Sequence, residues 1–379
     1  MNIVIDDKIP FIRGVLEPFG TVKYIPGKEI SRERIKDAEV LLIRTRTECN
    51  KKLLENTPVK FIASATIGYD HIDTRYCREN NITWKNAPGC NASSVKQYIA
   101  SALLFLASKF RFNLRDKTLG IVGVGNVGSK VSHLAVNLGM NILLNDPPRE
   151  RTEGSGIFST LDRILEESDI ISLHVPLNMK GIDRTFRMVD RSFLHTMKKG
   201  GFLINTSRGQ VVNNEAIKKE FATGKLAGIV LDVWDNEPDI DRKLLDITCL
   251  GTPHIAGYSA DGKANGTSMI VQAFSRFYGL ELDDWYPPEI PSPSRPVLPI
   301  DCRNKSTEQI IREAILHSYA IHSDDNNLRK SPAEFEKLRG DYPLRREFQA
   351  YTIELLFSDD TIEKTLTNLG FNIKKTTNG

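Results

Sequence analysis

The chain has 379 residues, a length that predicts two or three domains rather than one. Hydrophobic residues make up 40% and charged residues 26%, which is ordinary for a globular protein. The net charge of +3 is small for this length and gives no reason to expect binding to nucleic acid or to an anionic membrane. Any recognition of an anion should therefore be local.

The start of the chain and its cysteines are typical of a cytoplasmic protein. The first ten residues, MNIVIDDKIP, open directly into a strand-like run and lack the basic and long apolar regions of a signal peptide. The longest helix-like apolar stretch, residues 98–110, is too short and too interrupted to span a bilayer. The five cysteines form no CxxC pair, which predicts reduced thiols and no metal site.

Residues 1 to about 95 alternate short apolar runs with polar helical stretches. The runs NIVID, VKYI, EVLLIR, KFIASAT and ITWKN are typical of strands, so we expect a small α/β unit. The next segment, residues 92–110, has the apolar periodicity of a long helix and is expected to connect this unit to the rest of the chain.

A stronger alternation of strands and helices begins at residue 118. The runs TLGIVGVG, NILLND, DIISLHVP, GFLINTS, AGIVLDVW and TCLGTPH look like buried strands, which predicts a doubly wound parallel sheet. Near residue 280 the sequence DDWYPPEIPSPSRPVLPID is rich in proline and predicts a linker or an extended arm. Beyond it, a helical pattern and the strand-like AYTIELLF are enough for a small third domain.

The segment LGIVGVGNVGSKVSHLAVNLG holds Gly123, Gly125 and Gly128 in GxGxxG spacing, between a predicted strand and a predicted helix. This context is typical of a dinucleotide-binding turn, in which the helix N-terminus attracts the pyrophosphate. The next strand ends in Asp146, where an acid can bind the ribose 2′-hydroxyl. Because a carboxylate repels a 2′-phosphate, NAD is favoured over NADP, with S-adenosylmethionine and flavin as minor alternatives.

Three further predicted strands end in residues that can carry chemistry. Ligands of open α/β sheets bind beyond the carboxyl ends of the strands. There, INTSRG presents Arg208, LDVWDNEP presents Asp232 and Glu237, and TPHIAG presents His254. We therefore expect an arginine, two carboxylates and an imidazole to meet in one crevice.

These residue types fit the transfer of a hydride from a 2-hydroxy acid to NAD. Arg208 can hold the substrate carboxylate through two hydrogen bonds. His254 can accept the proton of the 2-hydroxyl, because an imidazole changes its protonation near neutral pH. Glu237 would fix the ring and favour the imidazolium, and Asp232 would hold the nicotinamide carboxamide.

The same segments resemble the D-2-hydroxyacid dehydrogenase family. The resemblance is carried by GIVGVGNVG, INTSRGQVVN, LDVWDNEP and TPHIAG, and it spans roughly residues 1–280 in order. It implies an NAD-dependent dehydrogenase, with Arg208, Glu237 and His254 as catalytic residues in the roles just given.

The resemblance also implies a division into domains. Residues 1–95 with 257–282 would form a flavodoxin-like substrate-binding, or lid, domain, and residues 96–256 a Rossmann-type, doubly wound NAD-binding domain, with a hinge near 92–110. The segments IDDKIPF, ATIGYDHID, NAPGCNA, TPHIAGYSADGKANGT and LRGDYPLRREF resemble one branch of the family that carries a small α+β C-terminal dimerisation domain. Here that domain would be residues 283–379, and the branch predicts a homodimer.

Further contacts follow from the resemblance. Position 45 is threonine where serine is common, which keeps the hydroxyl, and position 175 is valine where we expect threonine, so any side-chain bond to cofactor is lost there. The expected cofactor contacts are Gly123, Gly125, Asn126, Val127, Gly128, Asp146, Val175, Thr206, Ser207, Arg208, Asp232 and Gly257, and the expected substrate contacts include Thr45, Thr66 and Tyr258.

The strand-like run in AEVLLIRTRTE ends in Arg44 and Arg46, which would share one face of a strand and repel each other. The resembling branch oxidises 4-phospho-D-erythronate with NAD to (R)-3-hydroxy-2-oxo-4-phosphobutanoate, in the biosynthesis of pyridoxal 5′-phosphate. If Arg208 holds the carboxylate of this substrate, Arg44, Thr45 and Arg46 are the expected clamp for its phosphate across the cleft. Alternatively, each arginine pairs with a surface acid.

Two other functions stay open. A dehydrogenase of the same family that acts on 3-phosphoglycerate, or on another D-2-hydroxy acid, would share the catalytic residues, although the helical tail differs from the small ligand-sensing domain of many 3-phosphoglycerate enzymes. A non-enzymatic NAD-sensing binding protein is the alternative from a different class. The intact set of Arg208, Glu237 and His254 favours an enzyme.

Other candidate residues have plainer interpretations. We expect His71 to be structural and Cys90 to be a small packing residue. His174 lies directly before VP and would only line the cofactor cleft. Arg345 and Arg346 are expected to be solvated surface charges, unless one of them reaches the substrate cleft of a partner subunit.

Overall fold

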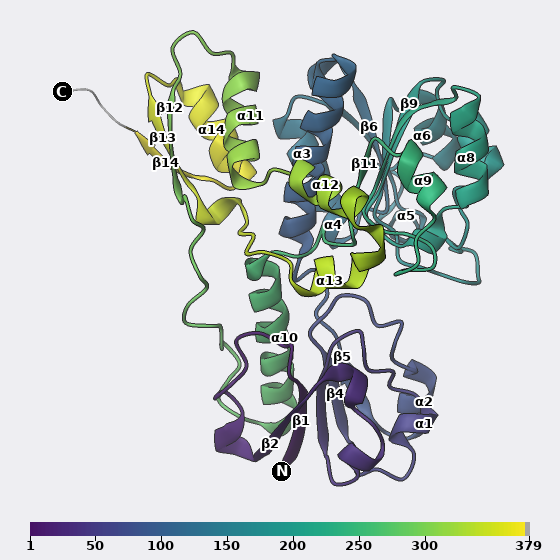
Figure 1. Cartoon of the computed structure of the whole chain (residues 1–379), viewed down its shortest axis with the longest axis vertical. Coiled ribbons are helices and arrows are strands. Elements are labelled where there is room, and N and C mark those ends of the chain that lie inside the picture. The colour runs from purple at the N-terminus through teal and green to yellow at the C-terminus, as the bar shows by residue number, and fades with distance from the viewer. Residues whose placement is uncertain (376–379) are drawn as a thin grey trace. The chain divides into compact units, whose positions relative to one another are not determined.

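The computed structural model describes residues 1–375 and divides into two compact units, which are described separately (Figure 1). Unit 1 comprises residues 1–91 and 259–291, and unit 2 comprises residues 92–258 together with the chain from residue 292 onward. Within residues 1–375, no helix is both long enough and apolar enough to cross a membrane.

Unit 1 is built on a five-stranded parallel sheet with the order β2-β1-β3-β4-β5, which is the flavodoxin-like order. Every residue of β3 and β4 is buried, as expected for central strands covered on both faces. One face packs against α10, whose Phe274 meets Phe61 of β4 edge-on. The elements are β1 (Asn2–Asp6), β2 (Thr21–Ile25), β3 (Val40–Ile43), β4 (Phe61–Ser64), β5 (Thr83–Lys85), α1 (Lys51–Leu54), α2 (Thr74–Glu79) and α10 (Ala260–Tyr278).

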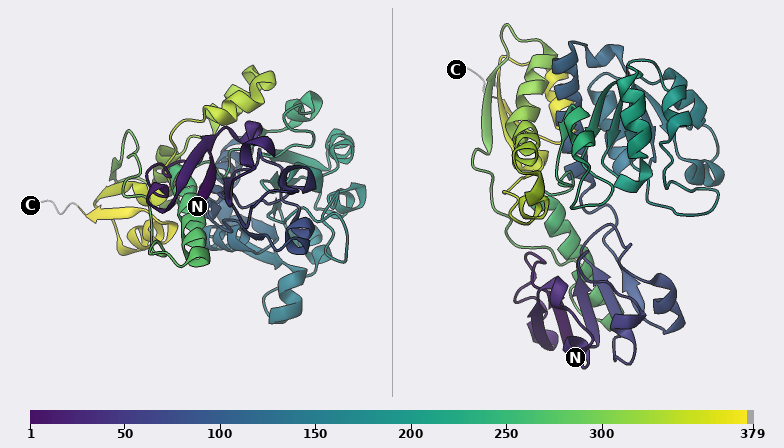
Figure 2. Two further views of the ribbon diagram at one scale, coloured as in Figure 1. Left: turned by 90° about the horizontal axis from the view of Figure 1, so that it is seen from below. Right: turned by 45° about the vertical axis from the view of Figure 1, so that its right-hand side comes forward.

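Unit 2 contains a six-stranded parallel sheet with the order β11-β10-β9-β8-β6-β7. The strand order reverses at β6, which pairs with both β7 and β8, and such a switch point is where open α/β sheets bind ligands. Figure 2 shows helices on both faces of this sheet. Its strands are β6 (Thr118–Val122), β7 (Asn141–Asn145), β8 (Ile170–Leu173), β9 (Gly201–Asn205), β10 (Leu226–Leu231) and β11 (Leu250–Gly251).

Two hydrophobic cores lie on the two faces of this sheet. One core contains α3 and α4, and the other contains α6, α7, α8 and α9. The predicted Rossmann-type doubly wound sheet is therefore confirmed. The helices are α3 (Ala92–Phe110), α4 (Asn126–Asn137), α5 (Pro147–Glu153), α6 (Leu161–Glu167), α7 (Arg191–Thr196), α8 (Asn214–Ala222) and α9 (Arg242–Ile247).

The C-terminal part of unit 2 adds a small parallel sheet with the order β12-β13-β14. Helices α11 and α14 bury their apolar faces against it, and they share one core with α3. The predicted small C-terminal α+β region is thus confirmed. Its elements are β12 (Val297–Asp301), α11 (Thr307–Ser318), α12 (His322–Lys330), α13 (Phe335–Gly340), β13 (Thr352–Leu356), α14 (Asp360–Leu369) and β14 (Asn372–Lys375).

Helix α3 is buried on most of its surface because the C-terminal part covers the side that the six-stranded sheet leaves open. Three of its buried polar residues, Ser94, Gln97 and Ser101, each donate a hydrogen bond to that part of the chain. The Gln97 amide donates to the carbonyl of Arg346, at 2.9 Å, and the Ser101 hydroxyl donates to the carbonyl of Tyr319, at 3.1 Å. These bonds attach the C-terminal part to the helix that precedes the glycine loop.

Candidate active site

The glycine loop leaves room for a dinucleotide at the N-terminus of α4. Gly123 has a φ of +89°, and a Cβ there would lie 2.7 Å from the carbonyl oxygen of His174. A Cβ on Gly128 would lie 2.0 Å from the carbonyl oxygen of Gly123, so this position also requires glycine. A Cβ on Gly125 would meet open space instead. The backbone amides at the start of α4 are therefore accessible to a pyrophosphate, which fits NAD.

The carboxylate of Asp146 is held against the glycine loop. It accepts hydrogen bonds from the backbone N–H of Val124, at 2.7 Å, and of Arg149, at 3.1 Å. Each oxygen has capacity for one more hydrogen bond, as the two hydroxyls of an adenosine ribose require. The Arg149 guanidinium is engaged beside it, donating to the carbonyl of Val124 and pairing with Glu153. This arrangement favours NAD over NADP.

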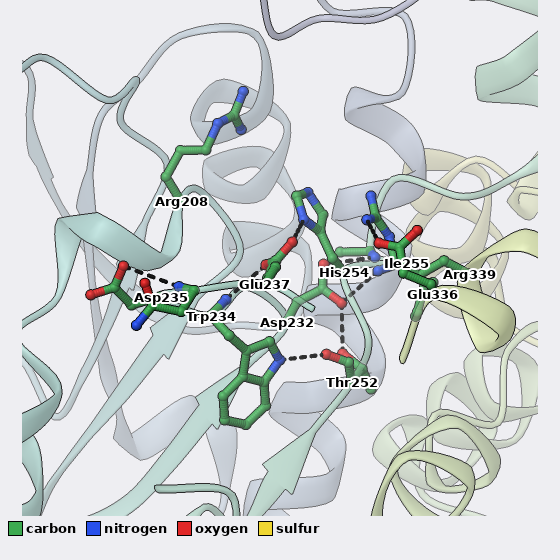
Figure 3. Close-up of polar contacts among 12 residues, drawn as sticks. Arg208, Asp232, Trp234, Asp235, Glu237, Thr252, His254, Ile255, Glu336 and Arg339 are labelled. Atoms are coloured by element: carbon green, nitrogen blue, oxygen red, sulfur yellow. Dashed lines mark hydrogen bonds and ion pairs between the residues drawn. The ribbon is translucent and has the colours of Figure 1, made fainter. Parts of the chain in front are cut away.

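A histidine–glutamate pair forms the chemical centre of unit 2 (Figure 3). His254 Nδ1 lies 2.7 Å from Glu237 Oε2, and Glu237 Oε1 accepts the backbone N–H of Trp234 at 2.8 Å. Burial alone would raise the pKa of Glu237, but the charge of His254 and these hydrogen bonds outweigh it, so the pKa is lowered. Because Nδ1 is engaged, Nε2 is the nitrogen of His254 that can exchange a proton with a substrate.

The loop that carries His254 is fixed by Asp232, which is 1% exposed. Asp232 Oδ1 accepts the Thr252 hydroxyl and the backbone N–H of Ile255, and Oδ2 accepts the backbone N–H of Ala256. Burial raises the pKa of Asp232, while the charge of His254 and the hydrogen bonds lower it less. Oδ2 retains one lone pair with which it could accept the predicted carboxamide.

Arg208 follows β9 and extends from its loop in the same direction as the His254 ring (Figure 3). Its Nη1 donates to the carbonyl of Ser207 at 2.9 Å, and the Ser207 hydroxyl donates to the side-chain oxygen of Asn205. Thr206 lies 3.4 Å from Nδ1 of His174. The run Thr206 to Arg208 therefore lies at the carboxyl end of the sheet with Asp232, as the sequence predicts.

The remaining predicted cofactor contacts of unit 2 surround the same loops. Asn126 and Val127 form the first turn of α4, and Val175 lies beside the glycine loop, 2.9 Å from where a Cβ of Gly123 would be. Gly257 and Tyr258 follow directly after the loop fixed by Asp232.

In unit 1, the predicted substrate residues lie after β3 and β4. Strand β3 ends at Ile43, so Arg44 and Arg46 belong to a turn, and the expectation that they share one face of a strand is wrong. Arg44 donates to the carbonyl of Lys8 at 3.3 Å, and Thr45 is exposed. The Thr66 hydroxyl donates to the carbonyl of Gly68 and lies 2.7 Å from the hydroxyl of Ser64, which also contacts His71.

The structure corrects the expectation for Arg345 and reveals a second arginine. Arg345 is 5% exposed rather than solvated, and its Nη2 donates to the carbonyl of Ala256 at 2.6 Å. Arg339, which sequence reasoning missed, donates to the hydroxyl of Tyr258 at 3.1 Å. Both act on the loop that contains His254, and neither lies in a motif whose spacing identifies it.

Comparisons with known proteins agree with this geometry. Residues 103–256 match the family described as D-isomer specific 2-hydroxyacid dehydrogenase, NAD binding domain, and residues 292–370 match a domain of unknown function, DUF3410. Erythronate-4-phosphate dehydrogenase of Bacteroides fragilis is 49% identical over 354 residues, covering 93% of this chain and 99% of that protein.

Two solved structures share the fold. The D-lactate dehydrogenase from Aquifex aeolicus, complexed with NAD and lactic acid, has a TM-score of 0.63 at 28% identity and covers 73% of this chain and 96% of its own. The NAD⁺-bound 3-phosphoglycerate dehydrogenase of Entamoeba histolytica has a TM-score of 0.62 at 27% identity, with coverage of 73% and 95%.

His174 gives a prediction for stability against pH. Its ring nitrogens contact the hydroxyls of Ser172 and Thr206, and burial lowers the pKa of His174 from 6.5 to about 3. The unfolded chain therefore binds a proton below about pH 6.5 that the folded chain does not, and the free energy of unfolding falls as the pH decreases toward 3.

We expect His174→Gln to lose this dependence. Between pH 7 and pH 5, its free energy of unfolding should fall by about 2 kcal/mol less than that of the wild type, measured by urea denaturation at both pH values. His133→Gln, in the exposed part of α4, is the matched control and should behave like the wild type. Equal pH dependence in His174→Gln and the wild type would contradict a ring that stays neutral in the folded chain.

Proposed function

Because the chain belongs to the erythronate-4-phosphate dehydrogenase family, we propose that it oxidises 4-phospho-D-erythronate at carbon 2 and gives (R)-3-hydroxy-2-oxo-4-phosphobutanoate. The observation that carries the proposal is the 2.7 Å pair of His254 and Glu237 at the carboxyl end of a sheet that also carries an NAD-type glycine loop. The chain is thus an NAD-dependent dehydrogenase of the D-2-hydroxyacid type. By family, its product enters the biosynthesis of pyridoxal 5′-phosphate.

In this proposal, each of the three catalytic residues of unit 2 has one task. Arg208 binds the substrate carboxylate, which matches the planar fork of a guanidinium. His254 accepts the proton of the 2-hydroxyl at Nε2, and the ionised Glu237 stabilises the imidazolium that results. NAD⁺, when bound, supplies the acceptor for the hydride that leaves carbon 2.

The phosphate end of the substrate is assigned to unit 1. Arg44 and Arg46 provide two guanidiniums within one turn, with the exposed Thr45 between them. We propose that these three residues bind the phosphate, and that Thr66 and Tyr258 are further substrate contacts. The support is the chemical match between a dianionic phosphate and two arginines.

Assembly, location and the finer domain boundaries are also proposals. We propose a homodimer formed through residues 283–379, supported by the separate C-terminal sheet and its own matched domain family. A cytoplasmic location is supported by five cysteines that are all buried and free. The division into a lid domain, an NAD-binding domain and a dimerisation domain, at the boundaries given above, stays a prediction.

A second candidate function is oxidation of 3-phosphoglycerate. The structural similarity to the Entamoeba enzyme favours it, although sequence identity favours the erythronate assignment. An NAD-sensing binding protein without activity has no need for the paired His254 and Glu237.

Single turnover with two substrates tests the proposal. Purified protein with NAD⁺ is mixed with 4-phospho-D-erythronate or with 3-phosphoglycerate, and the absorbance of the reduced nicotinamide is followed. We expect reduction with the first compound alone. Reduction with 3-phosphoglycerate alone would move the enzyme to the second candidate function, and reduction with neither would favour the sensor.

Glu237→Gln should lower the rate of hydride transfer about a hundredfold or more, because an amide cannot stabilise the imidazolium of His254. The KM should change little, since the residue does not bind the substrate. Glu215→Gln, in the exposed first turn of α8, is the control and should keep the wild-type rate. A Glu237→Gln variant with the wild-type rate would exclude His254 and Glu237 as the acid–base pair.

Arg44→Ala and Arg46→Ala should each raise the KM for 4-phospho-D-erythronate about tenfold or more, through loss of a charge-assisted hydrogen bond. The KM for D-erythronate, which lacks the phosphate, should not change. Arg34→Ala, which removes a surface arginine paired with Glu29, is the matched control. An unchanged KM in both variants would refute the phosphate clamp.

A further inference from the structure

Arg345 occupies a position that an ordinary ion pair does not explain. Its guanidinium is buried and lies over the ring of Tyr319, with 4.5 Å from Cζ to the ring centroid. Within residues 1–375, Nε and Nη1 have no hydrogen-bond partner, and the bond from Nη2 to the carbonyl of Ala256 is the one it makes. Burying a charge costs free energy. Because this charge is buried at a cost and its side chain makes one hydrogen bond, the role of Arg345 is to be sought in its contact with Ala256.

The backbone of Ala256 is held through both its N–H and its carbonyl. Its backbone N–H donates to Asp232 Oδ2 at 2.9 Å, and its carbonyl accepts from Arg345 at 2.6 Å. The N–H of Ile255 and the N–H of His254 are bonded to the same aspartate, through its side chain and its carbonyl. The catalytic histidine thus lies in a loop that is held on one side by Asp232, directly after β10, and on the other side by the C-terminal part.

The tyrosines around Arg345 fix its guanidinium in place. The hydroxyls of Tyr319 and Tyr342 both donate to Asp324 Oδ2, each at 2.7 Å. Their rings face the guanidinium at 4.5 and 5.7 Å from Cζ. Cation–π contact and the nearby carboxylate offset part of the cost of burying the charge. The arginine is consequently a rigid support rather than a mobile surface group.

Arg339 of α13, which Figure 3 shows beside Glu336, holds the far end of the same loop. Its Nη2 donates to the Tyr258 hydroxyl at 3.1 Å, and its Nη1 donates to Glu336 at 3.4 Å. Its charge also favours the ionised form of Glu237. Two arginines of one C-terminal segment, residues 335–345, therefore contact a loop of five residues that begins at His254.

We propose that Arg345 and Arg339 are positioning residues for His254 and Tyr258, so that the C-terminal part of the chain sets the geometry of the reaction as well as its proposed role in assembly. Arg345 acts through the carbonyl of Ala256, and Arg339 acts through the hydroxyl of Tyr258. The part of this inference that concerns turnover rests on the proposed function. The part that concerns the loop can be measured without any substrate.

Arg329 provides a matched control. It also joins the C-terminal part to the six-stranded sheet domain, donating to the carbonyls of Leu245 and Thr248 at 3.0 and 2.9 Å. Its acceptors lie at the C-terminus of α9 and not in the catalytic loop. Arg329→Met therefore removes a comparable anchoring arginine whose hydrogen bonds go to Leu245, Thr248 and Asp325 and not to residues 254–258.

The experiment compares full-length Arg345→Met, Arg345→Lys and Arg329→Met with the wild type. Three quantities are measured: the single-turnover rate of NAD⁺ reduction by 4-phospho-D-erythronate, the midpoint of thermal unfolding, and hydrogen–deuterium exchange of a peptide that covers residues 252–258. We expect Arg345→Met to slow hydride transfer about tenfold to a hundredfold and to speed exchange in that peptide. Arg345→Lys should recover part of the wild-type rate and part of the wild-type protection from exchange. Arg329→Met should lower only the midpoint of thermal unfolding.

The comparison of Arg345→Met with Arg329→Met separates positioning of the His254 loop from mere attachment of the C-terminal part. If Arg345→Met and Arg329→Met have the same effects, or if exchange of residues 252–258 is unchanged in Arg345→Met, the inference is wrong. If Arg345→Met does not fold, Arg339→Met and Tyr258→Phe replace it, each alone and both combined. If the effects of the two single changes on the rate add up in the combined variant, the inference is wrong. A wild type that does not turn over would refute the proposed function, while the exchange data would still decide the inference.

Discussion

The geometry of the site in unit 2 depends on the hydrogen bonds that the buried carboxylate of Asp232 accepts. Removing a carboxylate from water is costly unless donors replace the lost hydrogen bonds, and residues 252–256 supply three of them. Because these donors belong to one short loop, satisfying the carboxylate also fixes the loop. His254 lies within it, so the hydrogen bonds of Asp232 fix the backbone from which the His254 ring reaches Glu237.

The parallel sheet explains why segments distant in sequence meet at this point. All strands of the sheet are parallel, so the carboxyl ends of β6, β9, β10 and β11 lie at the same end of the sheet. The glycine loop, Arg208, Asp232 and His254 follow these ends. This much could be predicted from the sequence. GxGxxG after an apolar run, and polar residues directly after buried strands, are local signals that depend on the strands alone.

Other features depend on tertiary contacts and were beyond prediction. The sequence YPLRREF gives no sign that Arg345 is buried, because its surroundings come from Tyr319, Asp324 and Ala256, which are remote in the chain. The prediction that Arg44 and Arg46 lie in a strand was wrong for a different reason. The apolar run ends at Ile43, and strand boundaries are the least reliable part of pattern reasoning.

The reaction proposed for this chain moves a hydride from carbon 2 of a phosphorylated hydroxy acid to NAD⁺. The most direct test uses 4-phospho-D-erythronate with deuterium at carbon 2, followed by mass spectrometry of the reduced nicotinamide after one turnover. We predict that the deuterium is found in the reduced nicotinamide and that the turnover is slower than with protium. Reduced nicotinamide that contains only protium would contradict the claim.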